Sequence, residues 1–193
     1  MNLQSLAYGI FKICMNEGIN LQPTWAPRSE NCNADFISKM IDIDDWQTSH
    51  ECFEFMNEQW GPYTIDRFDN FTNAKLHRFN SKFWNPGIEA IYAFTQNWRN
   101  GNNWIVPPID LVARSISHLI LCKAEGTLIV PIWPSSYFWT FIFKRNFELQ
   151  PYVSEVIEFS CNKSIFVQGN NNNSIFGTSN FTSEVLAVKM KKT

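Results

Sequence analysis

Two features stand where short apolar segments end, and their residue types make them the first candidates for a site. Asp66 lies within segment 64–68, and Pro107-Pro108 follows segment 103–106. Helix-like stretches separate such segments, an alternation typical of crossover units around a parallel sheet. Because parallel sheets bind ligands outside the carboxyl ends of their strands, we expect Asp66 and the Pro107-Pro108 turn to border a site.

Both features also have an explanation that needs no ligand. Asp66 would be a strand-terminal acid that pairs with Arg67 or with a helix N-terminus. Pro107-Pro108 would be a turn that ends a strand and takes no part in catalysis. The residue types are compatible with either explanation.

A second candidate is a cluster of cations and aromatic rings after segment 64–68. Its members are Lys75, Arg78, Lys82 and Trp84, with Phe79 and Phe83 between them. Cations that contact phosphates and flat rings that stack on bases are what proteins use to bind single-stranded or flipped-out nucleotides. The alternative is a solvated loop whose aromatic side chains turn into the core.

The expected elements place both candidates in an α/β domain with a mostly parallel sheet. The predicted strands are 64–68, 103–106, 126–133, 153–159, 164–167 and 183–190. The predicted helices between them are 88–98, 110–123 and 137–143.

The first 42 residues are predicted to be a separate helix–strand–helix tail. It comprises a helix over 3–17, a strand over 19–25 and a helix over 34–40. A module of roughly 40 residues rarely folds unaided, so this one is expected to be part of something larger. Residues 43–59 are predicted to form a linker helix, and 60–193 the second domain. The acids at 42, 44 and 45 indicate a linker and cap, with a metal site as the alternative.

Composition excludes several classes of protein. The chain has 193 residues, of which 45% are hydrophobic and 16% aromatic, so it is not a disordered chain. Its net charge of −2 gives no overall basic surface for nucleic acid, so any such binding needs a local patch. The five cysteines form no C-x-x-C pair, which favours reduced thiols inside the cell, in cytoplasm or nucleus. No apolar run approaches the roughly 18 residues that a membrane span needs.

Residues 18–39 resemble the end of the ribonuclease H domain in DIRS-type retroelement reverse transcriptases. The shared pattern is W-x-P-R/G-x-x-N-x-x-A-D-x-x-S-R, with Lys39 where Arg is usual. Its members here are Trp25, Pro27, Arg28, Asn31, Ala34, Asp35 and Ser38. The resemblance implies that Asp35 is the last metal-binding carboxylate of a ribonuclease H site. Divalent metal would bind only with the domain's other carboxylates, which lie outside this sequence. The rest of the retroelement polyprotein is therefore an expected partner.

From about Trp60 to Met190 the chain resembles phage-type DNA adenine methyltransferases, and more closely the methyltransferase-like domain of DIRS-type retroelements. The opening D-R-F-A-x-x-x-N-A is matched over residues 66–74, and "NNWIVPP" and "GTLIVPIWPSSYFW" follow in order. The resemblance implies a Rossmann-like methyltransferase fold with S-adenosylmethionine as cofactor. It implies further that Asp66 and Asn73 contact the cofactor and that Pro107-Pro108 positions a flipped adenine in DNA.

Four positions depart from the family's pattern. Val106 stands where Asn or Asp holds the adenine amine, and Ile109 stands where an aromatic ring stacks on the base. Tyr92 replaces an Asp, and Asp69 replaces a small residue. Valine cannot accept the amine's hydrogen bond, and this contact is one that stabilises the transition state.

Three hypotheses follow from the two resemblances. The first is an S-adenosylmethionine-dependent DNA adenine methyltransferase. The second is a domain that has lost catalysis and serves as a part of the reverse transcriptase machinery that binds DNA or RNA or is structural. The third is a degenerate remnant. The missing polar group at residue 106 and the missing ring at residue 109 favour the second and third.

Overall fold

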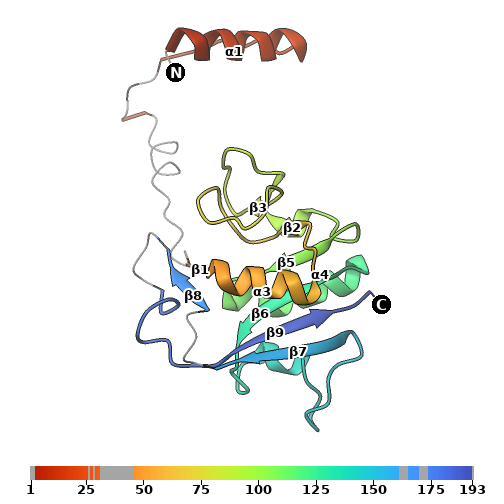
Figure 1. Cartoon of the computed structure of the whole chain (residues 1–193). Helices are drawn as coiled ribbons and strands as arrows, with labels where there is room; N and C mark the ends of the chain where they lie inside the picture. Colours follow the sequence, from red (N-terminus) through yellow and green to blue (C-terminus); the bar gives the residue numbers. More distant parts are fainter. Residues whose placement is uncertain are drawn as a thin grey trace. The chain divides into compact units, whose positions relative to one another are not determined.

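The computed structural model describes residues 3–25, 27, 29–30, 46–160, 165–169 and 174–192. The chain divides into two units, Met1–Ile41 and Asp42–Thr193 (Figure 1). In the first unit, helix α1 spans Leu3–Asn16. Gly18 follows it with a φ of +64°, the left-handed conformation that glycine adopts most easily. None of the α1 residues is buried.

The rest of the first unit departs from the predicted tail. Residues 19–25 are irregular, so the strand predicted there is wrong. A strand needs a hydrogen-bonded neighbour, and no strand pairs with this segment among the residues described. The helix predicted over 34–40 and the metal ligand Asp35 lie outside the described residues.

The second unit is a mixed α/β domain built on a five-stranded sheet. The strands are β2 (Ile65–Asp66), β5 (Asn102–Ile105), β6 (Glu125–Pro131), β9 (Val185–Met190) and β7 (Val153–Phe159), in that spatial order. Strands β2, β5 and β6 pair in parallel, and β9 pairs antiparallel with both β6 and β7. Asp66 and Pro107-Pro108, the two candidates for a site, therefore lie at the ends of neighbouring parallel strands.

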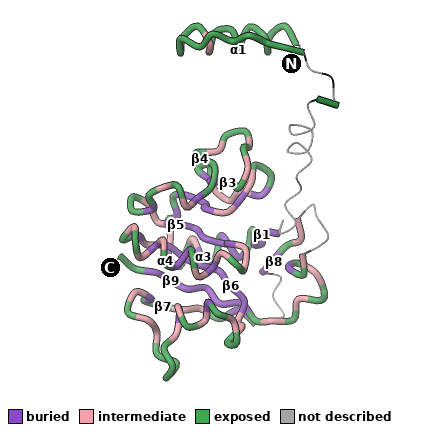
Figure 2. The backbone as a smooth tube through the Cα atoms, turned by 180° about the vertical axis from the view of Figure 1, so that it is seen from behind, coloured by how far each residue is buried: buried purple, intermediate pink, exposed green. Residues whose placement is uncertain are grey.

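Helices cover both faces of this sheet. Helix α3 (His50–Trp60) begins at Ser49, whose hydroxyl accepts the backbone N–H of Cys52 at 3.2 Å. Its buried side chains pack with Trp104 of β5 and Ile129 of β6. Helix α4 (Val112–Cys122) packs on the opposite face, with Ile105 and Leu128. Consecutive residues of each strand thus face different cores, which explains the continuous burial of β5, β6 and β9 (Figure 2). Helix α3, expected in a linker, is part of the domain core.

Two short pairs of strands complete the unit. Strand β1 (Trp46–Thr48) pairs antiparallel with β8 (Phe166–Gln168), and β3 (Asn80–Ser81) pairs in parallel with β4 (Ala90–Ile91). The aromatic segment predicted as a helix forms a 3-10 helix, η3 (Tyr137–Phe141).

The helix predicted over 88–98 is wrong. That segment contains β4 and a single 3-10 turn, η1 (Ala93–Thr95). The backbone N–H groups of Glu89 and Tyr92 donate to Phe79 and Ser81 at 3.0 and 2.8 Å, so pairing with β3 takes the bonds that a helix would use. The apolar spacing instead places Trp98 in the core, completely buried. A helix of this length has little stability of its own, so hydrogen bonding to β3 determines the conformation of residues 88–98.

Candidate functional site

The carboxyl ends of β2 and β5 lie side by side. Asp66 is the register partner of Trp104, and the backbone N–H of Arg67 donates to the Trp104 carbonyl at 3.0 Å. Strand β5 ends at Ile105, so Pro107-Pro108 follows immediately beyond the same edge of the sheet. The sheet thereby brings the two strand-end candidates to the edge where parallel sheets bind ligands.

The carboxylate of Asp66 is completely buried, and its oxygens are used inside its own loop. Oδ2 accepts the backbone N–H of Lys75 at 3.2 Å, and Oδ1 lies 3.4 Å from the backbone nitrogen of Phe68. The side chain also hydrogen-bonds to Asp69, itself buried. Burial raises the pKa of Asp66, since little solvent stabilises its charged form. These contacts close the loop between residues 66 and 75.

The second expected cofactor ligand, Asn73, also has a local partner. Its Oδ1 accepts the backbone N–H of Asn70 at 2.8 Å, and its own N–H lies 3.3 Å from the Asn70 carbonyl. The side chain is 9% exposed. Asn73 therefore holds the turn that brings Lys75 to Asp66.

The two positions beside the proline pair are packed in the apolar core. Val106 belongs to the core cluster under α3, and Ile109 packs against the clusters on both faces of the sheet. Pro107 is buried and Pro108 half-buried, leading into the 3-10 turn η2 (Ile109–Leu111) before α4. No polar side chain at 106 or ring at 109 is available for an adenine base.

Some members of the basic–aromatic cluster hydrogen-bond to side chains of the same domain, and others are exposed on its surface. Lys75 Nζ donates to Gln47 Oε1 at 2.7 Å, and Arg78 forms two hydrogen bonds to the Glu89 carboxylate, at 2.6 and 2.8 Å. That pairing raises the pKa of Arg78 and lowers the pKa of Glu89. Phe79 is buried, as the alternative for this cluster required.

Trp84 is the most outward-facing aromatic ring of the cluster. Its side chain is 72% exposed. Two residues earlier, Lys82 Nζ lies 5.5 Å from the centre of the Phe83 ring, a cation–π distance. The surface formed by Lys82, Phe83 and Trp84 is named the Trp84 surface below.

Sequence reasoning missed a buried cation. Arg67 is 5% exposed; its Nε donates to Asn103 Oδ1 at 2.8 Å and its Nη1 to Asn80 Oδ1 at 2.7 Å. Its guanidinium also lies 5.2 Å from the Trp98 ring centre. Burial lowers the pKa of Arg67 to about 10. The sequence offered one signal, the position of Asp66-Arg67 between the apolar residues Ile65 and Phe68, but an exposed arginine can have the same neighbours.

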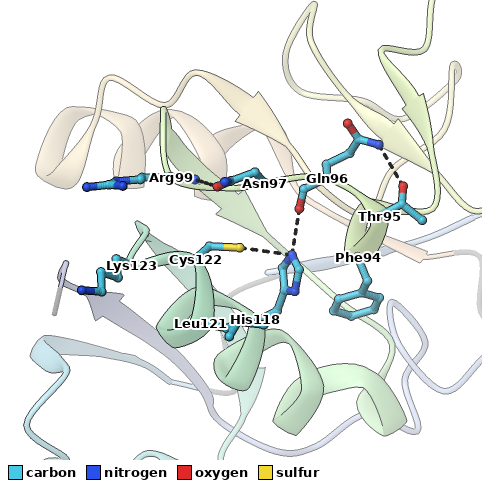
Figure 3. A pocket seen from close by; sticks show the side chains of 9 residues that line it. All are labelled: Phe94, Thr95, Gln96, Asn97, Arg99, His118, Leu121, Cys122 and Lys123. Atoms are coloured by element: carbon cyan, nitrogen blue, oxygen red, sulfur yellow. Dashed lines mark hydrogen bonds between the residues drawn. The ribbon is translucent and has the colours of Figure 1, made fainter.

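A pocket of about 450 Å³ lies at the other edge of the sheet, near the amino ends of β5 and β6 (Figure 3). It is bounded by the loop before β5 and by the last turns of α4. Its lining residues are Phe94, Thr95, Gln96, Asn97, Arg99, His118, Leu121, Cys122 and Lys123. None of the candidate residues selected from the sequence lines this pocket.

Two features are absent from the described part of the chain. No group of three or more His, Cys, Asp or Glu side chains there is placed to hold a metal ion. No helix there is long and apolar enough to cross a membrane.

Comparison with known proteins gives no family. No protein-family model matches the chain, and no curated protein is similar enough to count as a match.

Proposed function

We propose that residues 46–192 are a DNA adenine methyltransferase-like domain of a retroelement polyprotein that has lost methyl transfer and binds single-stranded nucleic acid. The resemblance of residues 60–190 is the basis for the first part. The adjacent, parallel ends of β2 and β5 support it, because they bring Asp66 and Pro107-Pro108 to one edge.

The packing at this edge supports the proposed loss of methyl transfer. A transferase must accept the hydrogen bonds of the adenine amine as charge develops on it. Val106 offers an apolar side chain buried under α3 instead. Asp66, the expected cofactor ligand, has its oxygens bonded within the loop 66–75.

The exposed indole of Trp84 carries the proposal of nucleic-acid binding. A large apolar ring that is 72% exposed and stands two residues along the chain from Lys82 offers the two parts of a single-strand site, a stacking surface and a phosphate contact. Binding of this kind is insensitive to sequence, because every base has a π-face. Arg78 is expected to contribute little, since Glu89 neutralises it.

The test is methyl incorporation and oligonucleotide binding, both measured on the full chain. Incubation with labelled S-adenosylmethionine and adenine-containing DNA is expected to give no incorporation above that of heat-denatured protein. A labelled oligothymidylate is expected to bind, and Trp84→Ala is expected to weaken that binding. Methyl incorporation by the wild type would instead support the enzyme hypothesis.

A further inference from the structure

A short hairpin before β7, residues 143–149, displays an aromatic ring at its tip. The backbone N–H of Lys144 donates to the Glu148 carbonyl at 2.7 Å, and the N–H of Phe147 donates to the Lys144 carbonyl at 3.0 Å. Residues 145–147 thus form the loop between the two arms. The Phe147 side chain is 76% exposed. In Figures 1 and 2 this hairpin projects below β7, at the end of the domain opposite to the β3–β4 pair.

Phe147 occupies a backbone position at which glycine is usual. Its φ is +62°, in the left-handed region, and a three-residue hairpin loop ordinarily places glycine there. A bulky side chain at positive φ is strained, and burial of the ring does not offset this strain because most of the ring is exposed. Folding alone therefore does not account for phenylalanine at this position. Strain that the fold does not need points to a role for the exposed ring in binding.

The base of the hairpin is held by the domain core. The backbone N–H of Gln150 donates to the carbonyl of Ile142, a completely buried residue, at 2.9 Å. The side-chain amide of Gln150 donates to the Thr140 carbonyl at 2.9 Å. The Phe143 ring stacks on the Trp139 ring at a centroid distance of 4.7 Å. A base held in this way limits the motion of the tip, which lowers the entropy cost of binding a partner.

The charges at the tip fit an anionic partner. Lys144 Nζ lies 3.3 Å from Glu148 Oε2, so these two charges offset each other. Arg145, the first residue of the loop, is exposed, and among the described residues no carboxylate pairs with it. The tip therefore presents an unneutralised cation two residues from a flat ring. A nucleotide of an unpaired strand supplies the matching groups, a phosphate for the cation and a base for the ring.

We propose that the hairpin 143–149 is a second contact for single-stranded nucleic acid, in which Phe147 stacks on a base and Arg145 contacts a phosphate. The inference rests on the proposed function, since it adds a contact for the same class of ligand. The hairpin and the Trp84 surface lie at opposite ends of the domain. A strand that reaches both is bound at two points, so loss of either contact weakens its binding.

The experiment is fluorescence anisotropy of the full chain with two labelled strands, an oligothymidylate and an abasic strand that has the phosphates and no bases. Each has about 30 nucleotides, roughly twice the longest site on one single-strand-binding fold. Phe147→Gly is the main variant. Because glycine adopts a φ of +62° without strain, we expect this variant to keep or raise the urea midpoint of the wild type.

Phe147→Gly is expected to weaken binding of oligothymidylate about tenfold and to leave binding of the abasic strand unchanged, because only the first has bases to stack. Arg145→Gln is expected to weaken binding of both strands, because both carry phosphates. Phe147→Trp keeps an aromatic ring and is expected to bind oligothymidylate as the wild type does.

The proposal alone is overturned if Phe147→Gly binds oligothymidylate as tightly as the wild type while Trp84→Ala binds it more weakly. It is also overturned if Phe147→Gly weakens binding of both strands equally, because the tip would then bind an anion without a base, as an acidic protein segment supplies it. A lower urea midpoint of Phe147→Gly would overturn it as well, because the ring would then stabilise the fold. Absence of oligothymidylate binding by the wild type overturns both this proposal and the proposed function.

Discussion

Arg67 and Asn103 are joined by a 2.8 Å hydrogen bond from Nε to Oδ1, both buried, across the parallel pair β2–β5. The amide nitrogen of Asn103 lies 3.1, 2.9 and 2.6 Å from the carbonyls of Trp98, Gly101 and Glu125, which share its two hydrogens. One asparagine thus contacts a buried cation and three backbone carbonyls. This network joins the amino end of β5 to Arg67, the residue that follows Asp66 at the end of β2.

Asn103→Ala is therefore expected to destabilise the protein strongly. Removing the amide leaves a guanidinium nitrogen and buried carbonyls without partners, at a cost of about 3 kcal/mol in the free energy of unfolding. Urea denaturation, monitored by tryptophan fluorescence, measures this change in the free energy of unfolding. The control is Asn100→Ala at an exposed position, expected to change stability by less than about 0.5 kcal/mol. Equal effects of the two variants would contradict the role given to Asn103.

The burial of Asp66 predicts a pH dependence of stability. Because the pKa of Asp66 is raised in the folded state, its contribution to stability is fully present below its unfolded value of about 3.9. That contribution is lost as pH rises through the folded pKa. Asp66→Asn keeps an acceptor oxygen for the loop and removes the titrating group. We expect the variant to gain stability relative to wild type as pH rises from 4 to 7.

Urea midpoints of both proteins at several pH values provide the check. Parallel stability curves for wild type and Asp66→Asn over this range would contradict a raised pKa at Asp66. Asn100→Ala, at an exposed position, leaves Asp66 and the groups around it in place, so it serves as a control that keeps the wild-type slope.

Neutralising Glu89 is expected to strengthen nucleic-acid binding. Glu89→Gln removes the carboxylate that holds Arg78 at 2.6 Å, and the released guanidinium adds an unneutralised cation to the basic–aromatic cluster. The exposed pair itself contributes roughly 0–1 kcal/mol to stability, so the variant should stay folded. Filter binding at low salt compares Glu89→Gln with Arg78→Gln. Tighter binding is expected from the first, and little change from the second.

Calorimetric titration of S-adenosylmethionine into the full chain is expected to give no saturable heat. The oxygens of Asp66 are bonded to Lys75 and Phe68 N–H groups, so a ligand would have to displace them at a loss of both bonds. Saturable binding that Asp66→Ala removes would show instead that the cofactor site persists and that the loop 66–75 opens.

The sequence predicted the α/β domain because apolar segments and helical periodicity are local properties. The spacing of apolar residues alone predicted the strand that ends at Asp66, the strand before Pro107 and the helix over 110–123. Segment 88–98 has the same periodicity, yet its N–H groups pair with β3, a neighbour that no local pattern reveals. The candidate site was harder to predict. Whether an acid such as Asp66 faces a ligand or its own loop depends on residues 68 to 75 folding back on it.

The buried pairing of Arg67 with two asparagines, and the contact of His118 with Cys122 in the pocket of Figure 3, depend on side-chain placement in three dimensions. Arg67 and Asn103 are 36 residues apart, and no spacing rule links them. His118 and Cys122 stand one helical turn apart, a spacing that predicts proximity but not a pocket.

Fluorescence anisotropy of a labelled oligothymidylate, titrated with the full chain at low salt, tests the central claim most directly. Trp84→Ala is the variant and Trp25→Ala the matched control, since Trp25 is 84% exposed in the other unit. We predict saturable, salt-sensitive binding that Trp84→Ala weakens about tenfold and Trp25→Ala leaves unchanged. Absence of binding by the wild type, or equal affinities of the wild type and Trp84→Ala, would contradict a nucleic-acid-binding role for this domain.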